Sequence, residues 1–394
     1  MKNLVLVLVF LSLLLSGCGP AATPEPSPTM APSPTLTFTA TETPIPSPTG
    51  TPTITPTSTV TPLYPLEGLG PANFPANVNP LTGLKASNPA LLERRPMLIK
   101  IPNLPRYVRP QWGVSFADLV FEYYTEEGTT RFAAIFYGND AQTVGPIRSG
   151  RLIDAYLVKG YKAIFAIGFA DPQEMILFQR SDFANRIVVE ISGSPMKRYD
   201  PNGSNYLTVG TSELSAYVTQ KGVENGRQNL NGMFFTLEPP AGGQPVAQVF
   251  VHYSGSVYNR WDYDTASGKN LRFADNYDVF SLDQREWYVP LTDRLTKKQI
   301  AFDNVVVLYV DHKFVKAGIY DIALIGSGDG YVARDGQIYP IYWARDDYDS
   351  VVTLDTLNRT PFALKPGTTF FEVVGLNTEM EKAAQSWRFN HKMP

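Results

Sequence analysis

The chain has very few of the side chains that carry thiol or metal chemistry. Of its 394 residues, one is cysteine and three are histidine. A single thiol excludes an intramolecular disulfide and a cysteine-based metal cluster. The histidines His252, His312 and His391 are far apart in the sequence, which favours neither a zinc site nor a Ser–His catalytic pair. We therefore expect neither a metal nor a cofactor.

Positive charge is absent from a long N-terminal stretch and is not in excess elsewhere. No lysine or arginine occurs between Lys2 and Lys85, and the formal net charge of the chain is −3. A nucleic-acid partner is not expected, because proteins that bind nucleic acids present a basic patch. Hydrophobic residues make up 43% of the chain, enough to form sizeable cores in the part that follows Lys85.

The first 17 residues have the pattern of a secretory signal peptide. Lys2 precedes an apolar run at positions 4–15, which is too short to span a membrane stably. The run ends in Leu-Ser-Gly-Cys at positions 15–18, which resembles the bacterial lipobox and implies cleavage before Cys18 and its lipidation. We expect an extracytoplasmic protein anchored to the bacterial membrane by lipidated Cys18. The alternative is an ordinary signal peptide followed by an incidental cysteine.

Residues 18–65 contain the lipidation site and a tract of proline, threonine and serine. Such a composition cannot bury enough apolar surface to offset the entropy of ordering it. We expect a disordered or polyproline-like tether that holds the rest of the chain away from the membrane. The composition leaves open whether the tether crosses a wall or is glycosylated.

The remaining chain predicts an N-terminal domain at 66–238, a C-terminal domain at 239–378 and a tail at 379–394. In the first domain, strand-like runs at 97–101, 117–124 and 129–137 precede helices that begin after Ser149, at Asp171 and before Leu214. The Asp-Pro-Gln-Glu sequence at 171–174 is the strongest helix start, with an Asp cap and a Glu that completes a capping box.

The second domain has a different texture, with short runs rich in Val, Ile and Tyr and little helical periodicity. Strands are expected at 247–253, 257–263, 304–310 and 337–343. Asp335-Gly336 favours a tight hairpin, and this makes the preceding glycines at 326–330 part of a hairpin rather than a nucleotide-binding loop. The fold class we predict is α+β, with an N-terminal α/β-type subdomain containing a mixed sheet and a predominantly β C-terminal subdomain.

A set of charged and polar residues in the first domain is the best candidate for a functional site. Asp118 and Glu122 fall on one strand, and Arg131 on the next strand would approach Glu122 if the two strands form a hairpin. Arg148, Ser149 and Arg151 precede a helix, whose N-terminus favours an anion. The arginines and Ser149 would bind a phosphate or carboxylate, and Glu122 or Asp118 would be the candidate catalytic base. The alternative is a structural network of ion pairs.

Aromatic residues of the second domain are candidates for a different kind of site, one that binds glycans. Exposed Tyr and Trp side chains stack on sugar rings, whereas buried ones pack in cores. The residues concerned are Tyr258, Trp261, Tyr263, Tyr331, Tyr339, Tyr342 and Trp343.

Several motifs resemble the YerB-like bacterial lipoproteins, whose two domains are known only as domains of unknown function. The matching stretches are N-P-L-T-G-L at 79–84, R-P-Q-W-G-V-S-F-A-D-L-V-F-E at 109–122, G-T-T-R-F at 128–132, G-P-I-R-S-G-R at 145–151 and G-D-G-Y-V-A-R-D-G-Q-I-Y-P-I-Y-W at 328–343. The resemblance implies a two-part α+β protein on the outer surface of the cytoplasmic membrane, with no established activity. This chain departs from the family at Ser204-Asn205, where a His-Asn pair is expected.

Three functional hypotheses follow. The first is a lipid-anchored protein that binds an anionic envelope component, such as a cell-wall or polyprenyl-phosphate ligand, without turning it over. The second is an envelope enzyme of phosphoryl or glycosyl transfer, or a hydrolase, with a carboxylate base and the arginine cluster. The third is a subunit that docks on another membrane protein. The sequence leaves the oligomeric state open.

Overall fold

The structure is a computed structural model, and it describes residues 69–200, 206–281 and 284–393. The predicted signal peptide, Cys18, the whole predicted tether at 18–65 and Ser204-Asn205 lie outside the described residues. All described residues belong to one compact unit of the chain, Val60–Pro394.

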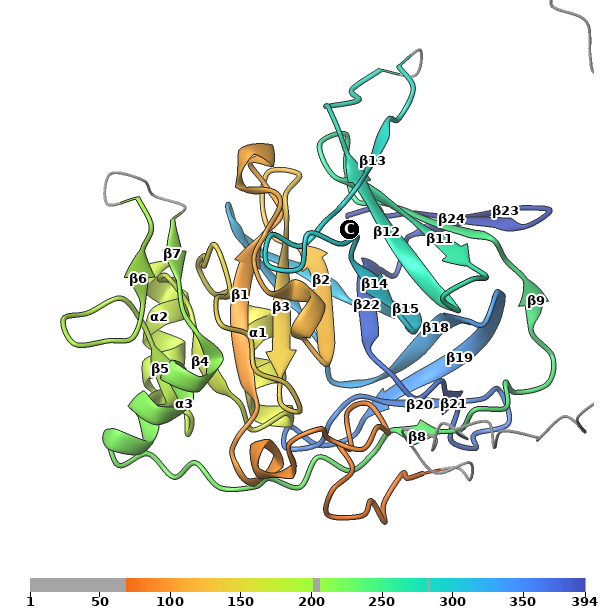
Figure 1. The fold of residues 1–394 in the computed structure, drawn as a ribbon. Coiled ribbons are helices and arrows are strands. Elements are labelled where there is room, and N and C mark those ends of the chain that lie inside the picture. Colours follow the sequence, from red (N-terminus) through yellow and green to blue (C-terminus); the bar gives the residue numbers. More distant parts are fainter. Residues whose placement is uncertain (1–68, 201–205, 282–283, 394) are drawn as a thin grey trace, which may run out of the picture. The chain divides into compact units, whose positions relative to one another are not determined.

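The main element is an 11-stranded mixed sheet to which both halves of the sequence contribute (Figure 1). β22 lies parallel to β15 on one side and to β2 on the other, so it joins the two halves in one sheet. In spatial order the strands are β20 (Thr353–Asp355), β19 (Gln337–Arg345), β18 (Gly326–Arg334), β15 (Asn304–Val310), β22 (Thr369–Gly375), β2 (Leu119–Tyr124), β3 (Thr130–Phe136), β1 (Met97–Pro102), β4 (Ile164–Ala166) and β5 (Ile187–Val188), with β9 (Gln244–Pro245) paired to β19.

The α-helices of the described residues all come from the first half, as predicted: α1 (Leu152–Gly160), α2 (Pro172–Gln179) and α3 (Thr211–Gln220). α2 begins at the predicted capping box, where Asp171 accepts a hydrogen bond from the Gln173 backbone N–H at 2.9 Å. Ser149 was predicted to cap α1, but the helix begins two residues later, with Arg151 at the cap position. Short 3-10 turns lie at Pro89–Glu93, Arg106–Val108, Val114–Phe116 and Ala184–Arg186.

A second sheet of seven strands packs on one face of the main sheet. Val249 and Trp261 of this sheet share a hydrophobic core with Val120 and Phe370 of the main sheet, and α3 contributes Leu214 to the same core. The opposite face is covered by α1, whose Ile153 packs with Phe121. The strands are β13 (Tyr288–Pro290), β12 (Lys269–Asp275), β11 (Tyr258–Asp264), β10 (Gln248–His252), β24 (Ser386–Asn390) and β23 (Glu379–Ala383), with β14 (Ala301–Phe302) paired to β12.

The C-terminal segment is a correction to the sequence analysis, which treated residues 379–394 as a tail. β23 and β24 form a hairpin there, and β24 lies parallel to β10 within the second sheet. Trp387 and Phe389 are buried, while the residues between and beside them are half-buried and polar. This alternation is the signature of a strand with one buried face, and it binds the end of the chain into the core.

Three two-stranded sheets complete the fold. They pair β16 (His312–Lys316) with β17 (Ile319–Ile322), β21 (Ala363–Leu364) with β8 (Phe234–Phe235), and β6 (Lys197–Arg198) with β7 (Leu207–Thr208). The predicted hairpin after β18 is confirmed, because Asp335 and Gly336 both have positive φ, 51° and 70°. The glycines at 326–330 lie within β18 itself.

A buried ionic group joins the two large sheets. Glu122 on β2 and Glu372 on β22 are directly opposite each other in register. Arg272 on β12 enters between them, donating to Glu372 Oε1 at 2.5 Å and to Glu122 Oε2. All three side chains are fully buried, and the guanidinium lies over the Trp261 ring, 4.8 Å from its centroid. We call this group the buried triad.

Removing the arginine of the triad should be strongly destabilising. Arg272→Met would leave two facing carboxyl groups in the core without their cation, and breaking a buried pair in this way costs about 3–5 kcal/mol. Chemical unfolding in urea, followed by circular dichroism, measures the loss. The matched control is Arg260→Met on β11, whose arginine forms a half-buried, solvent-accessible pair with Asp262; its loss should cost clearly less than that of Arg272, about 1 kcal/mol. Equal losses in the two variants would contradict a structural role for the triad.

Candidate functional site

Three of the predicted arginines do meet in space. Arg131 comes from β3, whereas Arg148 and Arg151 come from the loop that leads into α1. Arg131 donates to the Ser149 carbonyl at 2.8 Å and to Glu126 at 2.7 Å, and Arg151 Nε donates to Glu126 at 2.8 Å. We call Arg131, Arg148 and Arg151 the arginine cluster. Ser149 contributes its backbone carbonyl to it.

Local backbone bonds hold this cluster in place. The β2–β3 turn that presents Glu126 is closed by a bond from Thr125 N to Thr129 O at 2.9 Å, with Gly128 at φ 75°. Arg148 is pinned on both sides, since its N–H donates to the Lys100 carbonyl and its own carbonyl accepts from Gly168, both at 3.0 Å. The cluster therefore rests on the ends of β1, β3 and β4 rather than on a free loop.

Arg148 is the unsatisfied member of the cluster. No described residue forms a hydrogen bond or an ion pair with its guanidinium, and its Nε is buried without any partner. Burial and the charge of Arg151 lower the pKa of Arg148. Arg148 and Arg131 line a pocket of about 460 Å³ that opens to solvent. A buried N–H with no acceptor is costly, so this group is set to receive an acceptor from a ligand.

The cluster holds more positive charge than its neighbours balance. Burial and the charge of Arg151 lower the pKa of Arg131 to about 9. Burial alone would raise the pKa of Glu126, but hydrogen bonds from Arg151 and the charge of Arg131 hold it below its usual value. Arg151 also lies 3.8 Å from Glu174, whose pKa burial raises to about 7. One fully ionised carboxylate thus faces three guanidinium groups, and an anion would relieve their repulsion.

The N-terminus of α1 does not add to this site, which corrects one step of the sequence analysis. Its exposed N–H groups were expected to attract the anion. Instead, the Arg151 N–H donates to Asp154 at 2.7 Å and the Leu152 N–H donates to Glu174 at 3.1 Å. Because protein carboxylates already cap the helix, the guanidinium groups alone attract the anion.

Glu122 lies on the other face of the hairpin from Arg131, and the predicted approach of the two is wrong. In the observed register Arg131 opposes Tyr123, and Glu122 opposes Phe132. Directly opposed residues share a face, so a difference of one position sends the two side chains to opposite faces. Glu122 instead joins the buried triad and accepts a bond from Asn103 at 2.8 Å.

Asp118 is also enclosed in the protein. It accepts hydrogen bonds from Asn79 at 2.8 Å and from the backbone N–H groups of Tyr137 and Gly138 at 2.6 and 3.0 Å. Burial raises its pKa to about 6. Neither Asp118 nor Glu122 reaches solvent, and neither lines the pocket beside Arg148.

Sequence reasoning missed the residues that complete this pocket. Glu126 was not among the predicted site residues, although it is the carboxylate that Arg131 and Arg151 share. Arg106, Ser256 and Asp278 also line the pocket. Arg106 donates to the Ser256 carbonyl at 2.8 Å and to Asp278 at 2.9 Å. No local pattern could have found them, because 150 or more residues separate Arg106 from its partners.

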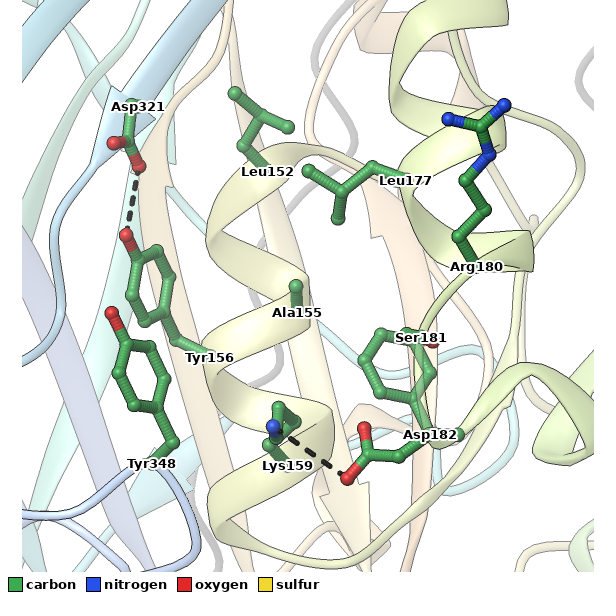
Figure 2. A pocket seen from close by; sticks show the side chains of 11 residues that line it. Leu152, Ala155, Tyr156, Lys159, Leu177, Arg180, Ser181, Asp182, Asp321 and Tyr348 are labelled. Carbon is green, nitrogen blue, oxygen red and sulfur yellow. Dashed lines mark hydrogen bonds and ion pairs between the residues drawn. The ribbon is translucent and has the colours of Figure 1, made fainter.

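A larger pocket of about 580 Å³ lies beside α1 and α2 (Figure 2). The rings of Tyr156 and Tyr348 stack with their centroids 5.9 Å apart, and the Tyr156 hydroxyl donates to Asp321 at 3.2 Å. Lys159 pairs with Asp182 at 3.5 Å across the lower end of the pocket. Apart from the exposed Arg180, these charged groups satisfy one another. This pocket therefore presents a weaker case for a site than the pocket beside Arg148.

The structure brings two of the three histidines together. The rings of His312 and His391 lie 5.1 Å apart, and burial lowers the pKa of each, to about 4 and about 3. His391 Nδ1 accepts from the Gly375 N–H at 2.9 Å, so in the neutral ring Nε2 carries the proton and offers no lone pair to a metal. Among the described residues, no group of three or more His, Cys, Asp or Glu is arranged to hold a metal ion.

Most of the aromatic side chains considered for glycan binding serve the core. Tyr258, Trp261, Tyr339 and Trp343 are buried. Trp261 additionally donates its indole N–H to Glu372 at 2.8 Å, which adds a bond to the buried triad. In the described part of the chain, no helix is both long enough and apolar enough to cross a membrane.

The fold and the motifs agree with a family assignment. Two family models match the chain, described as the N-terminal and C-terminal domains of a protein of unknown function (DUF3048), over residues 81–224 and 249–371. The chain belongs to this family, which confirms the predicted resemblance and the α+β class.

A particular relative comes from Bacillus subtilis (strain 168), where the protein described as "Putative lipoprotein YerB" is 30% identical over 304 residues. The match covers 75% of this chain and 85% of the relative. The crystal structure of YerB from Bacillus subtilis has a TM-score of 0.63 at 25% identity, covering 76% of this chain and 97% of that one.

The buried triad also predicts a dependence of stability on pH. Burial raises the pKa of Glu122 to about 7 against the attraction of Arg272. Because the folded protein holds this proton more tightly than the unfolded chain, the contribution of Glu122 is full below about pH 4.5 and is lost as the pH rises through about 7. We expect the free energy of unfolding to fall by up to about 3 kcal/mol over this range on account of Glu122.

Glu122→Gln should reduce this fall, since its amide stays neutral at every pH. Urea unfolding at a series of pH values from about 5 to about 8 measures the two slopes. Asp118 contributes a fall of the same sign, so some slope remains in the variant. Identical slopes for wild type and Glu122→Gln would contradict a raised pKa at Glu122.

Proposed function

We propose that this protein is a lipid-anchored, extracytoplasmic binding protein whose arginine cluster holds an anionic component of the cell envelope. The observation that carries the proposal is Arg148, whose guanidinium has no partner among the described residues and lines an open pocket beside Arg131. Guanidinium groups match phosphate and carboxylate oxygens in both charge and geometry.

The cellular location rests on the N-terminal sequence and on the relative. The Leu-Ser-Gly-Cys sequence at 15–18 supports lipidation of Cys18, and the relative from Bacillus subtilis is described as a lipoprotein. Residues 18–65 then serve as the tether between the lipid and the folded part. On this arrangement the pocket faces the extracytoplasmic space, where envelope precursors and polymers carry phosphate and carboxylate groups.

Binding is favoured over catalysis by the position of the two candidate carboxyl groups. A general base must come within hydrogen-bond reach of the proton that it removes. Asp118 and Glu122 are both fully buried and engaged by other protein groups. Three carboxylates line the pocket, Glu126, Glu127 and Asp278. Glu126 is held by two arginines and has a lowered pKa, which makes it a weak base, and Asp278 is paired with Arg106.

The anion site can be tested with pyrophosphate as the probe. Thermal unfolding of the protein should shift upwards with pyrophosphate, since a ligand at one hundred times its Kd that binds only the native state adds about 2.7 kcal/mol. Arg148→Ala should abolish the shift without lowering the starting midpoint, because Arg148 makes no side-chain bond that the fold depends on.

The matched control is Arg180→Ala, which removes an exposed guanidinium that lines the other pocket. It should retain the full pyrophosphate shift. The proposal fails if wild-type protein shows no shift, or if the shift persists in Arg148→Ala, since binding would then occur elsewhere.

A further inference from the structure

The pocket beside Arg148 is much larger than a single anionic group. Its volume of about 460 Å³ is in the range of sites that enclose whole small molecules. Both halves of the chain build it, with Arg131 and Arg148 from the first half and Ser256 and Asp278 from the second. The pocket therefore has room for a ligand in which the anionic group is attached to a larger, uncharged part.

Other residues that line the pocket offer polar groups that the protein does not use. The side chains of Ser256 and Glu127 form no hydrogen bond or ion pair with any described residue. Asp278 uses one carboxylate oxygen for Arg106, at 2.9 Å, and keeps the other available. Together they present one hydroxyl and two carboxylates around the same cavity.

These groups match a ligand rich in hydroxyl groups. Carboxylate oxygens accept hydrogen bonds from hydroxyls, and a serine hydroxyl both donates and accepts. A hydrocarbon chain in the same place would strip water from Glu127 and Asp278 and return no hydrogen bond, which is costly. These polar lining groups can hydrogen-bond the hydroxyl groups of a sugar, whereas they cannot do so with a lipid chain.

The anionic end is assigned by charge. Within the arginine cluster three guanidinium groups share one fully ionised carboxylate, Glu126, whereas the carboxylates of Glu127 and Asp278 line the pocket outside the cluster. A phosphate monoester carries nearly two negative charges at pH 7 and three acceptor oxygens, whereas a sugar carboxylate carries one charge and two oxygens. Phosphate is the better complement.

We infer that this pocket binds a phosphorylated sugar, with the phosphate on Arg148 and Arg131 and the sugar hydroxyls against Ser256, Glu127 and Asp278. The inference rests on the proposed anion site and names its ligand class. The chemistry is shared by a free sugar phosphate, which is a monoester, and by a sugar joined through phosphate to a lipid or polymer, which is a diester.

Titration calorimetry of the full chain tests the inference with four probes: glucose 1-phosphate, its methyl diester, butyl phosphate and inorganic phosphate. Glucose 1-phosphate should bind about tenfold or more tighter than inorganic phosphate and butyl phosphate, as expected from one or two added hydrogen bonds. A methyl diester that binds as tightly as the monoester identifies a lipid- or polymer-linked sugar as the source. A weaker diester identifies the free sugar phosphate.

Ser256→Ala and Glu127→Gln separate the sugar from the phosphate. Each should lower the ratio of the affinity for glucose 1-phosphate to that for inorganic phosphate severalfold. Ser256→Ala should leave the affinity for inorganic phosphate unchanged, whereas Glu127→Gln removes a negative charge from the cavity and should raise it. Neither side chain makes a bond within the described residues, so both variants should fold. The matched control is Ser327→Ala, an exposed serine on β18, which should change neither affinity.

The outcomes distinguish the inference from the function on which it rests. If inorganic phosphate binds and glucose 1-phosphate binds no tighter, the sugar assignment is overturned and the anion site stands. If butyl phosphate binds tightest, the body of the ligand is a hydrocarbon and the inference is wrong. If no probe binds, both the inference and the anion site are wrong.

Discussion

The packing of the two large sheets depends on two buried carboxyl groups, Glu122 and Glu372, whose repulsion Arg272 relieves. Glu122 and Glu372 face each other on neighbouring parallel strands inside the protein, and Arg272 from the other sheet is the cation between them. The net charge of the two carboxyl groups and the guanidinium is zero when one carboxyl group keeps its proton. Burial favours this state, because it raises the pKa of Glu122. Replacing a buried ionic group with apolar side chains of equal size is often neutral or stabilising, whereas these contacts fix the position of Arg272 on one sheet against Glu122 and Glu372 on the other.

This arrangement also positions the pocket. The β2–β3 hairpin carries Glu122 into the triad on one face and Arg131 into the arginine cluster on the other. The second sheet, held by Arg272, brings Ser256 to the same cavity. A further ionic link supports it, since Arg106 and Arg109 both donate to Asp275, at 2.6 and 2.9 Å. These charge pairs therefore set the spacing between Arg148 and Ser256, and both halves of the chain line the pocket.

Local sequence patterns predicted the features that depend on adjacent residues. They did not predict those that depend on how strands pair. The Asp171–Glu174 capping box and the Asp335-Gly336 turn are short-range devices whose hydrogen bonds and φ values depend on adjacent residues, and both occur as predicted. The gathering of Arg131, Arg148 and Arg151 also followed from a hairpin and a loop close in sequence. The predicted contact between Glu122 and Arg131 was wrong because the two residues are one position out of register, which places their side chains on opposite faces of the hairpin. The prediction of a tail at 379–394 was wrong because a five-residue strand such as β24 is hard to recognise from sequence without its pairing partner, β10.

The sequence by itself determined the class of fold and the three arginines of the cluster, since composition, turn chemistry and helix caps act over a few residues. Tertiary structure alone decided that the two halves share one sheet, that Asp118 and Glu122 are enclosed, and that the Arg148 side chain has no partner among the described residues. The shared sheet and the burial of Glu122 depend on residues more than a hundred positions apart, such as Glu122 with Glu372 and Arg272, whereas Asp118 is enclosed by Asn79, Tyr137 and Gly138, which are 19 to 39 positions away. Burial and long-range pairing decide whether a charged side chain is structural or free to bind, and neither is encoded in the spacing of neighbouring residues.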